Sequence, residues 1–227
     1  MKKYLLIILT LLFSVNVFCV NVNYKHVYSG DYSLFPKSDY SQFYSNKLKT
    51  IFPPNYSFQS VMFIPRAKMK GYSCEEVLQK LDQMGGLDKE CQGVCYVDAN
   101  THKLKARFKK SEYNAASREL YIKDKTAGGL VFDVDIERRG QTNNVYGVTA
   151  LLKKDPDNIF LREVRKNQAC IFVFMEEKAE GVNLYVLIQS ACSPLKLKFL
   201  RSLVENAISA RVLELQNWFY RMICTEK

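Results

Sequence analysis

The sequence is poor in the residues and motifs on which most enzymes depend. Its 227 residues include only two histidines, His26 and His102, and both lie in polar segments, so a histidine acid–base pair is not expected. It also lacks a Gly-x-Ser-x-Gly nucleophile motif, a glycine-rich phosphate-binding loop and a His-Glu-x-x-His metal motif. These absences argue against the common hydrolase, nucleotide-binding and zinc-protease classes. We expect a protein that is not an enzyme and needs no cofactor or metal.

The remaining catalytic alternative is a hydrolase that uses carboxylates alone. Asp133, Asp135 and Glu137 alternate along one predicted strand and therefore share one face. Arg138 and Arg139 adjoin them, which favours a solvated, charge-balanced surface over an acidic catalytic array.

The N-terminus has the layout of a secretory signal. Lys2 and Lys3 precede an apolar run over residues 4–13. The run is shorter than the roughly 20 apolar residues that span a bilayer, and a charged segment followed by an apolar one is typical of a signal peptide. We therefore expect residues 1–19 to be removed on export, giving a periplasmic or secreted protein.

The residues before the expected cleavage site decide between two forms of export. Cys19 as a lipidated first residue is the alternative, but Val17 and Phe18 are bulky where a lipidation motif prefers small side chains. The formal net charge is +10, from 33 basic and 23 acidic side chains. In an exported protein this charge favours contact with an anionic membrane surface over contact with nucleic acid.

Cysteine usage fits an oxidising compartment. Six of the seven cysteines follow the expected signal peptide, and an even number in an exported chain predicts disulfides. Cys192 and Cys224 are not expected to pair, because they would lie at opposite ends of one helix, roughly 45 Å apart. Cys91 with Cys74 or with Cys95 is the most local pairing. A zinc site at Cys91 and Cys95 would lack its second pair of ligands.

The order of predicted elements indicates an α+β fold. Residues 20–54 form an extension rich in tyrosine and serine, and residues 55–227 form a single α+β domain. Ser73 and Glu76 match a capping box at the start of a helix. From about Val94 the apolar period becomes two, which is typical of an antiparallel meander. The expected elements are a helix within Ser38–Ile51, a strand at Tyr56–Ile64, the helix after Ser73, and strands at Arg118–Lys123, Leu130–Glu137, Val145–Lys153, Ile159–Val164, Ala169–Glu176 and Val182–Ala191.

One predicted strand carries a basic face. Its basic residues alternate with Leu104, Ala106 and Phe108. A solvated outer face is one interpretation, and a dock for anionic lipid head groups or an acidic partner is the other. The basic residues are Lys103, Lys105, Arg107 and Lys109.

The C-terminus predicts a single long helix. Ser193 is a good N-cap, Pro194 suits the first turn, and no Gly or Pro follows through Cys224. An apolar stripe runs along the helix, so we expect it to lie lengthwise against the sheet. The stripe consists of Leu197, Leu200, Val204, Ala207, Ile208, Leu215, Trp218 and Met222.

This order of elements, a strand, a helical stretch, a long antiparallel meander and one long C-terminal helix, resembles the helix-grip fold. That fold belongs to the START-like and birch-pollen-allergen-like superfamily. The resemblance covers roughly residues 56–224 and rests on element order. It implies a curved sheet that wraps the C-terminal helix, an apolar cavity between them, and binding of a lipid or another apolar molecule.

Two sets of residues are candidates for such a site. Arg211 lies within the apolar stripe and stays charged, so it must pair with a sheet carboxylate, reach water, or bind a ligand carboxylate or phosphate. Aromatic residues of the meander and helix are candidates for the pocket wall, although the same residue types fill ordinary cores. They are Phe132, Tyr146, Phe172, Phe174, Tyr185 and Trp218.

The sequence therefore favours an exported, non-enzymatic protein that binds an apolar or amphipathic ligand between sheet and helix. The alternative is an envelope structural or interaction protein with a filled core and a basic binding surface. A cavity of at least about 300 Å³ would favour the first. Nothing in the sequence points to a particular oligomeric state.

Overall fold

A computed structural model describes residues 22–28, 30–81, 96–97, 104–105, 108–124, 127–142, 144–157, 163–192 and 201–226. Its secondary structure is, in chain order, β1 (Val22–Val27), α2 (Ser41–Ile51), β2 (Tyr56–Pro65), the 3-10 helix η1 (Arg66–Lys68), α3 (Cys74–Leu78), β3 (Tyr96–Val97), β4 (Leu104–Lys105), β5 (Phe108–Asn114), β6 (Glu119–Asp124), β7 (Gly128–Arg139), β8 (Val145–Leu152), β9 (Ala169–Lys178), β10 (Gly181–Ser190) and α4 (Arg201–Cys224).

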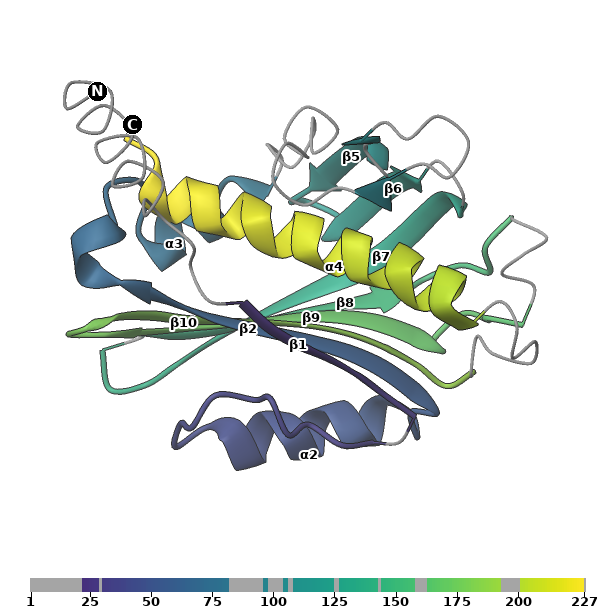
Figure 1. The fold of residues 1–227 in the computed structure, drawn as a ribbon, viewed down its shortest axis with the longest axis horizontal. Helices are drawn as coiled ribbons and strands as arrows, with labels where there is room; N and C mark the ends of the chain where they lie inside the picture. Colours follow the sequence, from purple (N-terminus) through teal and green to yellow (C-terminus); the bar gives the residue numbers. More distant parts are fainter. Residues whose placement is uncertain are drawn as a thin grey trace, which may run out of the picture.

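Eight strands form one antiparallel sheet in the order β1-β2-β10-β9-β8-β7-β6-β5. Strands β5 to β10 are a continuous meander, and β2 joins it by pairing with β10 along its whole length. The sheet bends so that β5, β6 and β7 rise beside α4, which runs along this face, while α2 covers the opposite face (Figure 1). The expected fold class, an antiparallel meander curved around a long C-terminal helix, is confirmed.

Each face of the sheet has its own hydrophobic core. Because side chains alternate along a strand, β9 supplies both cores. The core beneath α4 includes Met175 of β9 and Val212 and Phe219 of α4. The core beneath α2 includes Phe174 of β9 and Tyr44 of α2. The sheet is therefore the middle layer of three.

The loop before α3 fixes the end of α4. The amides of Gly71 and Tyr72 donate to the carbonyl oxygens of Ile223 and Met222, at 2.9 and 2.8 Å. They satisfy carbonyls that the last turn of a helix leaves unpaired. A Cβ on residue 71 would lie 2.3 Å from the Met222 oxygen, so a glycine is required here.

Several local expectations are met and others are corrected. The capping box of Ser73 and Glu76 is confirmed, although α3 ends at Leu78. Residues 22–27, expected within an irregular extension, form an edge strand on β2. Most of the strand expected at 159–164 lies outside the described residues, and Glu163 and Val164 are not in a strand.

The cysteines differ from the expectation of disulfides. Cys74, Cys170, Cys192 and Cys224 are all free, so Cys74 does not form the local bridge considered above. The other cysteines lie outside the described residues. Among the described ranges, no three metal-ligating side chains cluster, and no helix is long and apolar enough to cross a membrane.

Candidate functional site: a two-chamber cavity beneath α4

A cavity of about 140 Å³ lies between α4 and strands β6, β7, β9 and β10. We call it the Arg211 chamber. Most of its wall is aliphatic or aromatic, and its two charged residues are Asp124 and Arg211. The remaining lining residues are Ile122, Leu130, Phe132, Ala169, Cys170, Ile171, Ile188 and Leu215.

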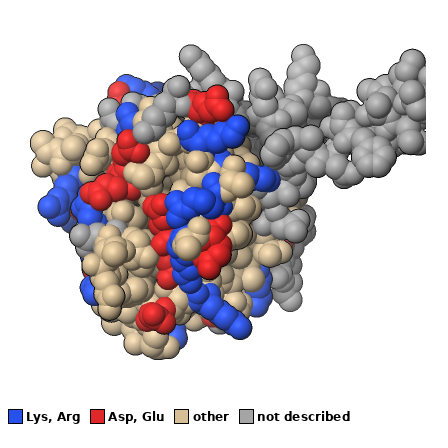
Figure 2. Space-filling model, turned by 90° about the vertical axis from the view of Figure 1, so that its left-hand side faces the viewer, with Lys and Arg blue, Asp and Glu red and all other residues tan. Residues whose placement is uncertain are grey.

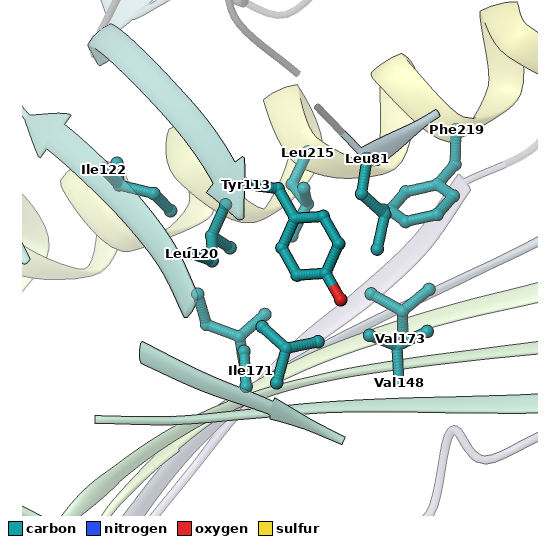
Figure 3. Close-up of a pocket in the computed structure, with 11 residues that line it drawn as sticks. Leu81, Tyr113, Leu120, Ile122, Val148, Ile171, Val173, Leu215 and Phe219 are labelled. Carbon is teal, nitrogen blue, oxygen red and sulfur yellow. The ribbon is translucent and has the colours of Figure 1, made fainter. Parts of the chain in front are cut away.

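A second space of about 30 Å³, the Tyr113 chamber, shares lining residues with the first. Figure 3 shows the side chains that line it. The two chambers share Ile122, Ile171 and Leu215, which therefore separate them. The remaining lining residues of the Tyr113 chamber are Leu81, Tyr113, Leu120, Val134, Val148, Ala150, Val173 and Phe219.

Strand alternation explains why these side chains meet. Leu120, Ile122 and Asp124 are spaced two apart on β6, so all three face α4. Leu120 lies opposite Phe132 on β7, which carries the same face across to the next strand. The cavity wall is thus the concave face of the meander, and α4 closes it.

Arg211 forms an ion pair with Asp124 at the end of β6. Its Nε donates to Asp124 Oδ2 at 2.6 Å and its Nη2 donates to Oδ1 at 2.7 Å. Its Nη1 also donates to the carbonyl oxygen of Ala207, and the amide of Ala127 donates to Asp124 Oδ1. The side chain of Arg211 is 15% exposed and that of Asp124 is fully buried.

This geometry is bidentate, which is the strongest arrangement for a guanidinium and a carboxylate. It is the first of the three alternatives weighed for Arg211, a pair with a sheet carboxylate. The ion pair carries no net charge, so the chamber presents a neutral dipolar group and no unpaired cation for a ligand.

Tyr113 is the polar residue of the second chamber. It extends from β5, and its ring lies across the chamber with the hydroxyl directed toward Val148 and Val173 (Figure 3). Its side chain is half-buried.

Three of the aromatic candidates lie on the other side of the sheet. Phe172, Phe174 and Tyr185 belong to the core beneath α2, where they pack with Phe35 and Tyr44. They do not line the cavity. The strand period placed Phe172 and Phe174 on one face correctly but gave no means of choosing the face, because both faces are covered.

The other three aromatic candidates lie on the α4 side. Phe132 lines the Arg211 chamber. Tyr146 and Trp218 are buried in the core beneath α4 but line neither chamber, and burial raises the pKa of Tyr146. Trp218 packs edge-on against Phe219 with ring centroids 4.9 Å apart, and Phe219 lines the Tyr113 chamber. Trp218 therefore lies one side chain away from the cavity.

Two of the four residues of the predicted basic face lie in described strands. Lys105 belongs to β4, which pairs with β3, and Lys109 belongs to β5 in the main sheet. Lys103 and Arg107 lie outside the described residues. The single basic face therefore stays a prediction.

Opposite charges intermingle at the end of the molecule near α3 and η1 (Figure 2). Arg66 pairs with Glu177 at 2.7 Å and Arg138 pairs with Glu75 at 3.2 Å. This end is a surface of ion pairs and has no single sign of charge.

Sequence reasoning missed Asp124 and Tyr113. The signal for Asp124 was present, because it continues the inward-facing series of Leu120 and Ile122 on β6. A carboxylate in such a position must find a cation. Tyr113 carried no comparable signal, since it lies on an edge strand where a tyrosine is ordinary.

The comparisons with known proteins add little beyond the fold. No protein-family model matches the chain, and no curated protein matches it. Among solved structures, the chain is similar to a STAR-related lipid transfer protein from Xanthomonas axonopodis. The sequences are 14% identical, the TM-score is 0.44, and the match covers 73% of this chain and 86% of that chain.

Proposed function

We propose that this protein binds a small apolar molecule with an uncharged polar group in the cavity between the sheet and α4. The observation that carries the proposal is an apolar cavity whose one pair of charged groups is already neutralised internally. An apolar wall with a few convergent polar groups is the usual character of a small-molecule site.

The volume sets the size of the ligand. The Arg211 chamber, at about 140 Å³, is smaller than the roughly 300 Å³ of a typical drug-sized site. It is close to the roughly 150 Å³ of an engineered apolar cavity that binds benzene. In this closed form it admits a ring or a short alkyl chain. A longer lipid requires α4 or the side chains between the chambers to move.

The ion pair sets the head group. A hydroxyl or carbonyl can hydrogen-bond to Arg211 or Asp124 without adding charge. A carboxylate would bring an uncompensated negative charge beside Asp124. Burying an unpaired ion of this kind costs roughly several kcal/mol. We therefore expect neutral head groups in preference to the anionic ones considered from the sequence alone.

Titration of Trp218 fluorescence tests the proposal, because Trp218 is the only tryptophan and contacts the cavity wall through Phe219. Octanol, decanol and dodecanol are expected to shift its emission, and the matched fatty acids are expected to bind at least about tenfold more weakly. Ala169→Leu, which fills the Arg211 chamber, should abolish binding, whereas Ala116→Leu in an exposed turn should not.

Native mass spectrometry of protein purified from its own source supplies a second readout. A co-purifying neutral apolar molecule supports the proposal. Flat alkanol titrations together with ligand-free protein would contradict it and favour the envelope structural or interaction protein. Export remains a prediction from residues 1–19, and the N-terminal residue of the mature protein tests it.

A further inference from the structure

The Arg211 chamber offers a ligand very few polar groups. The strands that line it each lie between two others, so their backbone N–H and C=O groups are used within the sheet. Three of its described lining residues have polar side chains: Asp124, Cys170 and Arg211. The Cys170 side chain belongs to the core beneath α2, on the opposite face, and its thiol donates to the Ile171 carbonyl oxygen. Asp124 and Arg211 therefore remain.

The carboxylate of Asp124 is closed to a ligand. Its Oδ1 accepts from Nη2 of Arg211 and from the amide of Ala127, each at 2.7 Å, and its Oδ2 accepts from Nε of Arg211 at 2.6 Å. The Asp124 side chain is also fully buried. A ligand in the chamber therefore cannot use this carboxylate as a hydrogen-bond acceptor.

Arg211 still has hydrogen-bond donors to offer. A guanidinium carries five N–H groups and no acceptor. Nε and Nη2 each use one N–H on Asp124, and Nη1 uses one on the carbonyl oxygen of Ala207. Within the described parts of the chain, the second N–H of Nη1 and that of Nη2 have no partner, and the side chain is 15% exposed. These two nitrogens are neighbours in one plane, so a single oxygen atom can accept from both.

We propose that the ligand of the Arg211 chamber carries a carbonyl group, as in a ketone or an ester, whose oxygen accepts from Nη1 and Nη2 of Arg211. The inference rests on the proposed function and narrows its uncharged head groups to one class. A hydroxyl oxygen can also accept from Arg211, but its own O–H finds no acceptor in the chamber. A buried donor without an acceptor loses the hydrogen bonds that it had with water. A carbonyl has no donor, so it leaves nothing unpaired.

Cyclohexanone, cyclohexanol and cyclohexane test the inference, because they share one ring and differ in the polar group. Each is similar in size to benzene, which an apolar cavity of roughly 150 Å³ admits, so the closed chamber can hold them. We would measure their dissociation constants for wild-type protein by isothermal titration calorimetry. The ketone should bind at least about fivefold more tightly than the alcohol, the effect of one buried donor left unpaired.

A double variant, Asp124→Leu combined with Arg211→Met, tests whether Arg211 is the donor. Leucine keeps the branched shape of the carboxylate, and apolar replacement of a whole buried ion pair is often neutral or stabilising, so we expect a folded protein. The affinity for cyclohexanone relative to cyclohexane should fall at least about tenfold, because the ketone loses a hydrogen bond to a charged group.

The matched control is Arg66→Met combined with Glu177→Leu. Arg66 and Glu177 also form an arginine–carboxylate pair, at 2.7 Å, and neither lines the chamber. This variant should keep the wild-type ratio of the affinities for cyclohexanone and cyclohexane.

Infrared spectroscopy of wild-type protein gives a readout that does not depend on any variant. The carbonyl stretching band of bound cyclohexanone should lie at lower frequency than the band in hexane, because a hydrogen bond weakens the C=O bond. A band at the hexane position would overturn the inference.

The outcomes separate the inference from the function beneath it. If cyclohexane and the ketone bind but the alcohol binds as tightly as the ketone, or if the double variant keeps the wild-type ratio of ketone to cyclohexane, the carbonyl ligand is overturned and the apolar site stands. If wild-type protein binds none of the three, the proposed function fails and the inference with it.

Discussion

The Asp124–Arg211 pair is the residue-scale feature on which the chemistry of the cavity depends. Its partners come from β6 and α4, 87 positions apart in the chain, and both side chains are largely removed from water. Burial makes such a pair costly to form and still more costly to break, because the survivor is a buried charge without a counter-ion.

Asp124→Asn tests this account. Loss of the carboxylate should reduce the free energy of unfolding by roughly 3–5 kcal/mol, measured by urea denaturation. The substitution should also reverse the ligand preference, because Arg211 would then be free to pair with a ligand carboxylate. Decanoate should therefore bind better than decanol.

Asp133→Asn is the matched control for Asp124→Asn. Asp133 pairs with Lys153 at 2.8 Å, but its side chain is 53% exposed on the outward face of β7. The free energy of unfolding of this variant should be close to that of the wild type, and the variant should keep the preference for neutral ligands. Equal destabilisation by the two substitutions would show that the buried pair has no special role.

The residue scale also shows where sequence reasoning stopped. A charged Arg211 within an apolar stripe was sufficient to predict that a partner or a ligand must exist. The identity of the partner depends on where β6 ends relative to α4, and this is a product of sheet curvature that no local pattern encodes.

At the scale of elements, α4 shows that hydrophobic periodicity predicted the buried face of the helix only in part. The apolar stripe on α4 correctly included Ile208 and Leu215. Val212 and Phe219 are among the most completely buried residues of the helix, and Gln216 lies among them. The predicted stripe left out Val212 and Phe219, so it was set too far to one side.

The buried Gln216 side chain is accommodated by hydrogen bonds to the sheet. Its Oε1 accepts from the Ser60 hydroxyl at 2.5 Å, and its Nε2 donates to the Leu184 carbonyl at 3.3 Å. A satisfied amide of this kind is compatible with a core, but its partners lie on β2 and β10 and are not visible in the helix sequence.

The packing of α2 on the sheet depends on a glycine in β8. A Cβ on residue 147 would lie 2.5 Å from Cε1 of Tyr44, whose ring is fully buried there. Gly147→Ala should therefore shift α2 and lower the free energy of unfolding by about 1–3 kcal/mol, the usual cost of overpacking. Urea denaturation and the loss of near-ultraviolet circular dichroism would measure this.

Gly129→Ala is the control for Gly147→Ala. Its added Cβ would lie 3.2 Å from the terminal hydroxyl of Tyr121, a group at the far end of a flexible side chain. The two substitutions differ little in chemistry and strongly in surroundings. Similar unfolding energies for both would contradict a close contact between α2 and β8.

At the scale of the whole molecule, tyrosine burial predicts how stability depends on pH. The protein has 14 tyrosines, and burial raises the pKa of Tyr32 and of Tyr44 from the ordinary 10.0 to about 12. Burial also raises the pKa of Tyr56 and Tyr185. In the unfolded chain these phenols release protons near their ordinary pKa.

The unfolded state therefore binds fewer protons than the folded state once the pH exceeds about 10. The free energy of unfolding should be constant with respect to these groups below that pH and should fall steeply between about pH 10 and pH 12. Urea denaturation across this range measures the slope. Tyr44→Phe should make the slope shallower, and an unchanged slope would contradict the burial of this phenol.

The fold class was predictable at this scale because it follows from the order of elements. A meander followed by one helix has few compact arrangements, and the alternation of apolar and charged residues in β7 indicated a strand there. The N-terminal strand β1 was not predictable. Its residues Asn23, Tyr24 and Lys25 are exposed, so its main stabilisation is backbone pairing with β2, which leaves no apolar pattern.

The pairing of β2 with β10 has a consequence for how the chain reaches this fold. Gln59 and Tyr185, hydrogen-bonded across these strands, are separated by 126 positions in the chain. A two-stranded fragment such as β1 with β2 is marginal in water, so the early segments gain stable neighbours only after β10 has been synthesised. The contact order is therefore high, and we expect the chain to fold slowly, because folding rates fall as contact order rises. Because α4 closes the cavity and follows every strand of the sheet in the chain, a nascent chain has an open binding face until α4 has been synthesised.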